Sequence, residues 1–213
     1  MLRRRHKAKI IFVIVLSFVC VYYFTVFVPA TRSLCKREVE SVIRIAINQS
    51  NEVIVNKSLT YEDVFTVTYS DEKEVTSVRA NVGLINQLAM LWGTEIQNNI
   101  NNKKEVLIRR PAGAFSGSVF LSQFGREVTL HCTFSAISST DYSSVFIRQG
   151  VNQTMHRLYL EAKVEATVLS PFSSETLEVR DTFLFSEAII NGKVPGTYIS
   201  SENFGEYLDL LGN

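Results

Sequence analysis

The strongest constraint on the fold is an uncharged apolar run near the N-terminus. Residues Ile10–Val28 contain no charged residue, glycine or proline. As an α-helix, these 19 residues would span about 28 Å, close to the thickness of a bilayer's hydrocarbon core. A core helix of a small domain would need a polar face, which this run does not offer. The sequence therefore predicts a membrane span.

The charges around this run predict its orientation. Five basic residues precede it: Arg3, Arg4, Arg5, Lys7 and Lys9. The first acidic residue is Glu38. Because basic residues stay on the cytoplasmic side, we expect a cytoplasmic tail at 1–9 and a single-pass anchor in the cell membrane at 10–28. A signal peptide cleaved near Ala30 is the alternative, but the run exceeds a signal core of about 7–15 residues.

The rest of the chain reads as one acidic domain. Without the basic tail, 17 Lys and Arg face 21 Asp and Glu, a formal net charge of −4. Nucleic-acid binders show a basic surface, so we exclude nucleic acid as a partner. About 180 residues are enough for one core. We expect an extracytoplasmic domain at 31–200 and an acidic C-terminal tail at 201–213.

The three cysteines, Cys20, Cys35 and Cys132, do not form a disulfide framework or a CxxC pair. Cys20 lies in the predicted span, and pairing of Cys35 with Cys132 stays open. The chain has no nucleophile elbow and no HExxH motif, and no neighbourhood of a catalytic cysteine. We therefore predict no catalytic residues, no metal and no cofactor.

Apolar periodicity predicts the elements after the span. An apolar rhythm of 3.6 residues over 35–55 predicts a helix, which either packs on the domain, as we favour, or forms a stalk. Two alternating strands are predicted over 64–69 and 75–80. A helix capped by Asn81 follows to about Asn99, and a strand over 105–109. This αββαβ order occurs in small modules that assemble into rings at membranes, although order alone is a weak signal.

The second half reads as sheet. Residues 111–118 predict a tight loop with Phe115 and Phe120 tucked inward. Strands are predicted over 128–134, where Cys132 is buried and His131 exposed, and over 158–168 and 176–185; Asn191-Gly192 signals a turn. The predicted fold class is α+β: an N-terminal transmembrane helix, then an αββαβ-like module and a mainly antiparallel β second half.

Three motifs resemble the YunB family of sporulation proteins. The first is Gly150–Leu160, a Gly-hydrophobic-Asn-Gln-Thr-x-His-Arg run that leads into a strand. The second is Glu187–Tyr198, and a weaker third is Gly113–Leu121. The sequence departs from the expected pattern at Ala136–Thr140, where we expect a connection containing glycine or proline.

The resemblance implies a membrane-anchored protein of endospore-forming bacteria, made in the mother cell and located in its membrane. We expect a non-enzymatic scaffold or assembly factor that meets sporulation or envelope proteins or copies of itself. The alternative is an enzyme or accessory factor acting on spore cortex peptidoglycan. A third class, a small-ligand sensor, would need an apolar cavity beside the second-half sheet.

The first motif supplies the candidate binding residues: Asn152, Gln153, His156 and Arg157. On a functional interpretation, their polar groups form a pocket or a protein contact. On a structural interpretation, Asn152 and Gln153 satisfy backbone groups of an irregular connection, and His156 lies beside the core. An enzyme should bring His156 together with a carboxylate in a cleft.

Overall fold

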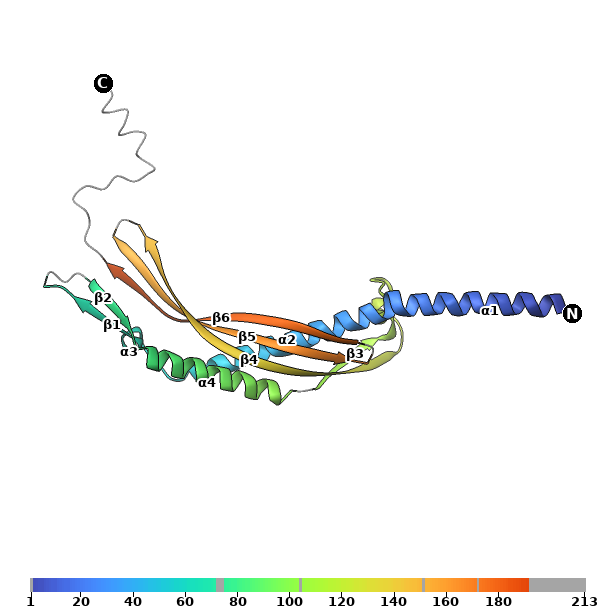
Figure 1. Ribbon diagram of the computed structural model, residues 1–213, viewed down its shortest axis with the longest axis horizontal. Helices are drawn as coiled ribbons and strands as arrows, with labels where there is room; N and C mark the ends of the chain where they lie inside the picture. The colour runs from blue at the N-terminus through green and yellow to red at the C-terminus, as the bar shows by residue number, and fades with distance from the viewer. Residues whose placement is uncertain (1, 72–74, 104, 151, 172, 192–213) are drawn as a thin grey trace, which may run out of the picture. The chain divides into compact units, whose positions relative to one another are not determined.

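The computed structural model describes residues 2–71, 75–103, 105–150, 152–171 and 173–191 (Figure 1). The helices are α1 (Leu2–Tyr22), α2 (Val28–Val55), α3 (Tyr61–Val64) and α4 (Val82–Asn101), with a π-helical turn at Tyr23–Phe27 and 3-10 turns at Ala112–Ser116 and Leu121–Gln123. The strands are β1 (Phe65–Tyr69), β2 (Val75–Ala80), β3 (Glu105–Pro111), β4 (Glu127–Gln149), β5 (Gln153–Ser170) and β6 (Ser173–Asn191).

These elements divide between two compact units. Unit 1 comprises the residues up to Val53, together with Trp92–Ser139 and Ala162–Asp181. Unit 2 comprises Ile54–Leu91, Thr140–Glu161 and the described residues from Thr182 onward. Strands β4, β5 and β6 each contribute residues to both units. The sequence analysis expected one domain at 31–200, and that boundary stays a prediction.

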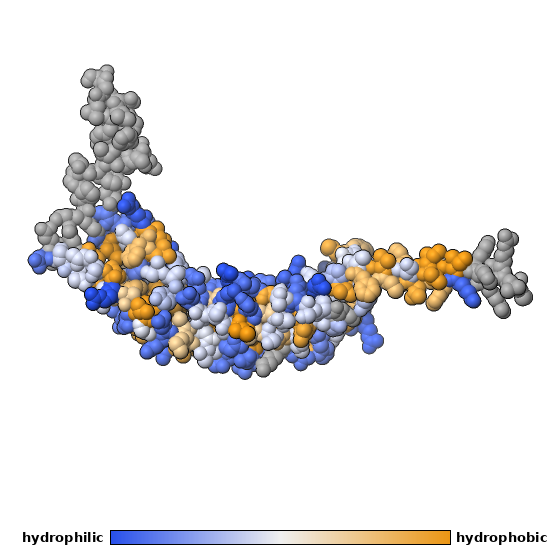
Figure 2. Space-filling view, viewed as in Figure 1, coloured by the Kyte–Doolittle hydropathy of each residue, from blue (hydrophilic) through white to orange (hydrophobic). Residues whose placement is uncertain are grey.

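The N-terminal helix is long and apolar enough to cross a membrane, and none of its apolar stretch is buried in the protein. Its large side chains between Ile10 and Val21 are exposed, and α1 is coloured as hydrophobic in Figure 2. Because exposed apolar surface of this length is unfavourable in water, the finding supports membrane association through a single candidate span. We call residues 10–28 the candidate span.

The helix continues past the candidate span through a π-helical turn at Tyr23–Phe27. Pro29 has no backbone N–H, so it cannot donate to the carbonyl of Thr25 four residues earlier. Separately, the N–H of Val28 donates to the carbonyl of Tyr23, five residues back, as in a π-helix. The turn therefore widens without breaking the helix, and α2 follows directly.

The helix predicted over 35–55 packs on unit 1. This confirms the expectation that its apolar face is covered by the domain. Val39, Ile43, Ala46 and Ile47 are buried. The stalk alternative is wrong because α2 is also tied to unit 1 by polar contacts. Glu38 accepts a hydrogen bond from Arg110 at 2.7 Å, Asn51 from the Trp92 indole at 3.0 Å, and Ser50 Oγ from Asn99 at 2.9 Å.

A disulfide joins α2 to β4. Cys35 and Cys132 are bonded, with their Cα atoms 6.2 Å apart and both side chains buried. The sequence analysis left this pairing open. The bridge closes a chain segment with a sequence separation of 97 residues within unit 1.

Unit 2 contains a small hairpin beside α3. Thr60 donates its backbone N–H and its hydroxyl to Asp63 at 2.7 and 2.8 Å, which fixes the start of α3. Strands β1 and β2 pair antiparallel, as predicted, from Phe65 opposite Ala80 onward. Helix α4 begins after Asn81, whose side chain accepts the N–H of Leu84 at 3.2 Å, so the predicted cap is confirmed.

The predicted αββαβ order is present, but its strands divide between two sheets. Strands β1 and β2 form a two-stranded sheet, whereas β3 belongs to a four-stranded sheet in the order β3-β4-β5-β6. Strand β3 pairs antiparallel with β4, from Glu105 opposite Thr133 to Pro111 opposite Glu127.

The long strands follow the predicted alternation. In β5, every second residue from His156 to Val168 is buried, as expected. On the opposite face of β5, Lys163 forms ion pairs with Glu165 at 2.5 Å and with Glu178 of β6 at 3.3 Å. Strand β4 runs through Ala136–Thr140, the segment that lacks the glycine or proline of the expected family pattern.

The loop after β3 is predicted half correctly. Phe115 is buried, but Phe120 is 78% exposed, so the expectation that both rings tuck inward is wrong. The turn predicted at Asn191-Gly192, the second motif from residue 192, and the tail at 201–213 lie outside the described residues, although Asn191 is the last residue of β6.

Candidate functional site

The candidate site is built around the imidazole of His156 in unit 2. In β5, this side chain lies on the buried face of the strand, two residues before Leu158, and it is 1% exposed. Its Nδ1 lies 2.6 Å from the Tyr61 hydroxyl, and its Nε2 lies 2.7 Å from the Ser144 hydroxyl. In either neutral tautomer, one ring nitrogen donates and the other accepts, so both contacts are satisfied.

Aromatic rings enclose the same imidazole. Phe146 stacks on it, with ring centroids 4.1 Å apart and planes 4° from parallel. Phe65 meets it edge-on at 4.5 Å, and Tyr61 does so at 5.6 Å. Phe65 also belongs to the core of unit 2 with Val64, Ile85 and Leu158. The imidazole is therefore a polar member of this core, held by two hydroxyls.

The electrostatics of this cluster favour neutral groups. Burial lowers the pKa of His156 below its ordinary value of 6.5, because the ring loses solvation of its charged form. Burial also raises the pKa of Tyr61, with a smaller contribution from the carboxylate of Glu62. At neutral pH the pair is an uncharged imidazole beside an uncharged phenol.

Arg157, next along β5, points away from this cluster. Its guanidinium donates to Glu187 of β6 at 2.5 Å and to the Tyr159 hydroxyl at 3.4 Å. The hydrogen bond to Glu187 is the largest cause that raises the pKa of Arg157. Arg157 therefore links β5 to β6 within unit 2.

Asn152 and Gln153 lie at the hairpin between β4 and β5. Asn152 is half-buried, and Gln153 is exposed as the first residue of β5. Gly150 has a φ of 72°, the left-handed conformation that the hairpin requires and that glycine adopts without strain. Of the four predicted residues, His156 enters the buried cluster and Arg157 forms an ion pair. No binding role of the four is tested by these positions.

Sequence reasoning did not identify the partners of His156. Tyr61 lies 95 residues from it in the chain, and Ser144 and Phe146 lie in β4 beyond the strand predicted over 128–134. The hydrophobic alternation marks which side of a strand is buried, but it does not show which distant side chain lies opposite. The sequence indicated only that His156 lies on the same buried face of the strand as Leu158, two residues later.

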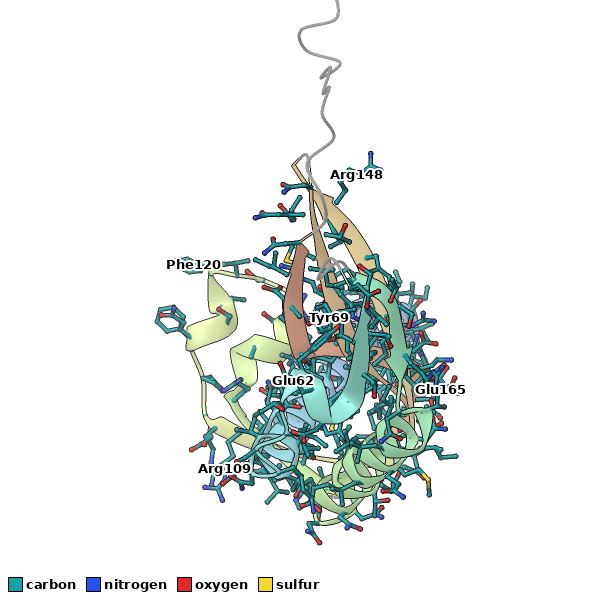
Figure 3. The ribbon with its side chains drawn as sticks, turned by 90° about the vertical axis from the view of Figure 1, so that its left-hand side faces the viewer. Glu62, Tyr69, Arg109, Phe120, Arg148 and Glu165 are labelled. Atoms are coloured by element: carbon teal, nitrogen blue, oxygen red, sulfur yellow. A yellow bond between two sulfur atoms is a disulfide. The ribbon has the colours of Figure 1, made fainter. Side chains whose placement is uncertain are left out.

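A hollow of about 570 Å³ lies beside this cluster in unit 2. It is lined by α3, β1, the start of β2 and the end of β6, and Figure 3 labels Glu62 and Tyr69 on its wall. Tyr61 belongs both to this lining and to the contacts of His156. A molecule entering the hollow would therefore touch the phenol that holds the imidazole.

Within the described residues, no group of three or more His, Cys, Asp or Glu side chains is arranged to hold a metal ion. The expectations of no metal, no cofactor and no enzymatic activity stay predictions.

Comparison with known proteins gives one match. A family model described as sporulation protein YunB (Spo_YunB) matches residues 107–197. No curated protein and no solved structure matches the chain. The matched region begins in β3, includes the loop after it and strands β4 and β5, and contains His156 and Arg157. Over these residues, the chain is similar to the YunB family of sporulation proteins.

Proposed function

We propose that this protein is a non-enzymatic scaffold or assembly factor of endospore formation, anchored in the mother-cell membrane by residues 10–28. Its N-terminus lies in the cytoplasm, and its C-terminal part meets envelope proteins or copies of itself outside. The family match supports the sporulation role, and the candidate span supports the anchor. The basic residues before the span support the orientation.

The observation that carries the scaffold role is the position of β6 at the end of the four-stranded sheet. Among the described strands, β6 has a neighbour on one side, β5, and an open edge on the other. In unit 2 this edge strand exposes Leu184 and Ile189, the latter to 59%. An edge strand presents backbone donors and acceptors to another chain, and exposed apolar side chains strengthen such pairing.

The contacts of His156 also support a non-enzymatic role. Both ring nitrogens are used by hydroxyl groups inside the protein, and the ring is closed off by aromatic neighbours. Neither hydrogen-bond partner is a carboxylate, which the enzymatic alternative required. His156 therefore connects α3 and β4 to β5 through these hydrogen bonds in unit 2.

Lysine substitutions on β6 test the scaffold proposal. Leu184→Lys and Ile189→Lys each place a charge on the edge strand, which should block strand pairing. Because Ile189 also lines the hollow beside Tyr61, the Leu184→Lys variant separates the edge from the hollow. Ile137→Lys is the matched control, because Ile137 is 75% exposed on β4 in unit 1. We expect full-length protein in detergent micelles to be oligomeric by light scattering, or to crosslink to partners through position 189 in sporulating cells.

The β6 variants should lose this association and lower the yield of mature spores, whereas the control should not. The proposal fails if the wild-type chain is a strict monomer at high concentration, forms no crosslinks through position 189, and the β6 variants sporulate normally. Fluorescent fusions at either end, imaged in sporulating cells, test the orientation and the mother-cell membrane. A tag at the N-terminus should fluoresce and fractionate with the mother-cell cytoplasmic face.

One observation favours the enzymatic alternative. Ser144 Oγ lies 2.7 Å from the Nε2 of His156, and a hydroxyl beside an imidazole is the pair used in nucleophilic catalysis. Tyr61 would then orient the base from the other ring nitrogen. Ser144→Ala separates the two functions: a scaffold keeps its spore yield with this variant, whereas a hydrolase that uses the serine loses its activity on the cortex.

A further inference from the structure

The backbone of the loop between β3 and β4 is held in one conformation by hydrogen bonds and close contacts. The N–H of Ala112 donates to the carbonyl of Arg126 at 2.9 Å, and the N–H of Gly113 donates to the carbonyl of Phe124 at 2.9 Å. A Cβ on Gly113 would lie 1.7 Å from the carbonyl oxygen of Leu121, so only glycine fits there. Ser116 Oγ further donates to the carbonyl of Gly113 at 2.6 Å. The segment 112–126 therefore holds a defined conformation.

This defined loop displays apolar side chains outward. Val119 is 91% exposed and Phe120 is 78% exposed, and Leu121 and Phe124 are also exposed. The rings of Phe120 and Phe124 lie 5.8 Å apart and contact each other, and Val119 and Leu121 flank Phe120 in the chain. Figure 3 labels Phe120 on this loop. We call Val119, Phe120, Leu121 and Phe124 the apolar tip. Clustered exposed apolar side chains mark a contact surface.

The base of the loop touches the candidate span. The Tyr22 hydroxyl donates to the carbonyl of Ser116 at 3.2 Å, and the rings of Phe27 and Phe115 lie 6.1 Å apart. A Cβ on Gly117 would lie 2.7 Å from a methyl group of Val26. Figure 1 shows this loop beside the C-terminal end of α1, and all these residues belong to unit 1.

The position of these contacts along the span gives their depth. Tyr22 lies six residues before Val28, the last residue of the candidate span, which is about 9 Å along a helix. Apolar segments that lie in a membrane interface insert by about 5–10 Å. The loop base is thus level with the part of the span that borders the headgroups.

We propose that the apolar tip inserts into the lipid beside the span and forms a second membrane contact of unit 1. The occupant of this surface is the bilayer, because the base of the loop that carries the tip contacts the span at interfacial depth. Exposed arginines flank the loop and the end of the span, at Arg32, Arg109 and Arg126, where they suit anionic headgroups. A second copy of the chain is the competing occupant.

The second contact fixes the orientation of unit 1 relative to the membrane. A single helix leaves a domain free to rotate about the helix axis, whereas a second insertion point beside it selects one rotational position. This inference rests on the candidate span and not on the scaffold role, so β6 variants and tip variants report on separate claims.

Tryptophan placed in the tip tests the proposal. The chain has one tryptophan, Trp92, which is fully buried in unit 1 and supplies a constant background. Full-length Phe120→Trp is reconstituted into vesicles that contain lipids brominated on their acyl chains. Ile137→Trp is the matched control, since Ile137 is a similarly exposed apolar residue on β4. Circular dichroism of both variants checks that the fold is kept.

We expect the added emission of Phe120→Trp to be blue-shifted and quenched by bromine near the headgroup end of the chains. The added emission of Ile137→Trp should match that of a tryptophan in water and be unaffected by bromine. The proposal is overturned if position 120 emits like position 137. It is equally overturned if the emission at 120 is blue-shifted but not quenched, because the tip is then covered by protein.

Discussion

Replacing Cys35 and Cys132 by alanine should lower the stability of unit 1 by several kcal/mol. The bridge joins residues with a sequence separation of 97, so it restricts the unfolded chain over a long segment. For a closed loop of about 100 residues, the chain-entropy treatment gives about 4.7 kcal/mol, and removal of native bridges costs about 2–5 kcal/mol. Both sulfurs are buried, so the alanines leave only small voids.

The assay is urea unfolding of the full-length protein in detergent micelles, followed by the fluorescence of Trp92. This residue is fully buried and donates its indole N–H to Asn51 on α2, so its emission reports on unit 1. With a urea slope of about 2 kcal/mol per M, a loss of about 2–4.7 kcal/mol moves the midpoint down by about 1–2.4 M.

Two controls make the result specific. Cys20→Ala removes the free cysteine of the candidate span and should leave the midpoint unchanged. Wild-type protein treated with a thiol reductant should unfold at the midpoint of the double variant. If the double variant and the wild type unfold at the same urea concentration under oxidising conditions, the bridge does not stabilise unit 1 and the reasoning is refuted.

Two further predictions concern the loop and the histidine. Gly113→Ala should destabilise unit 1 by about 1–3 kcal/mol or more, because its methyl group would overlap the Leu121 carbonyl; Gly83→Ala, which meets nothing closer than 3.7 Å, should be neutral or stabilising in the same thermal scans. Because burial lowers the pKa of His156, its unfolded form binds more protons below pH 6.5. The stability of unit 2 is thus complete above pH 6.5 and falls as the pH drops toward the folded pKa. Hydrogen exchange over 153–161 should show this loss in the wild type and in His131→Gln, but less of it in His156→Gln; an equal loss in all three would contradict it.

Much of the fold follows from periodicity in the sequence. The helical rhythm places Ile85, Trp92 and Ile96 on one buried face of α4, and the alternation of β5 places Leu158 and Val168 in the core. In both cases, neighbours along the chain share one burial pattern, so a local window contains the information. The candidate span is readable for the same reason, as a run of residues without charge.

The features that sequence reasoning missed depend on distant partners or on irregular backbone. The burial of Cys132 follows from strand parity, but its bond to Cys35 depends on how α2 lies on β4. The contact of His156 with Tyr61 depends likewise on the placement of α3 in unit 2. Phe120 lies in a segment with no repeating pattern, where the hydrogen bonds of Gly113 decide which side chains face outward.

The uninterrupted passage from the candidate span into α2 has a mechanical consequence. No flexible hinge separates the lipid-facing part of the helix from the stripe at Val39 and Ile43 that is buried in unit 1. Hydrophobic spans tilt when the bilayer thins around them. A thinner bilayer around the candidate span would therefore tilt unit 1 together with the helix.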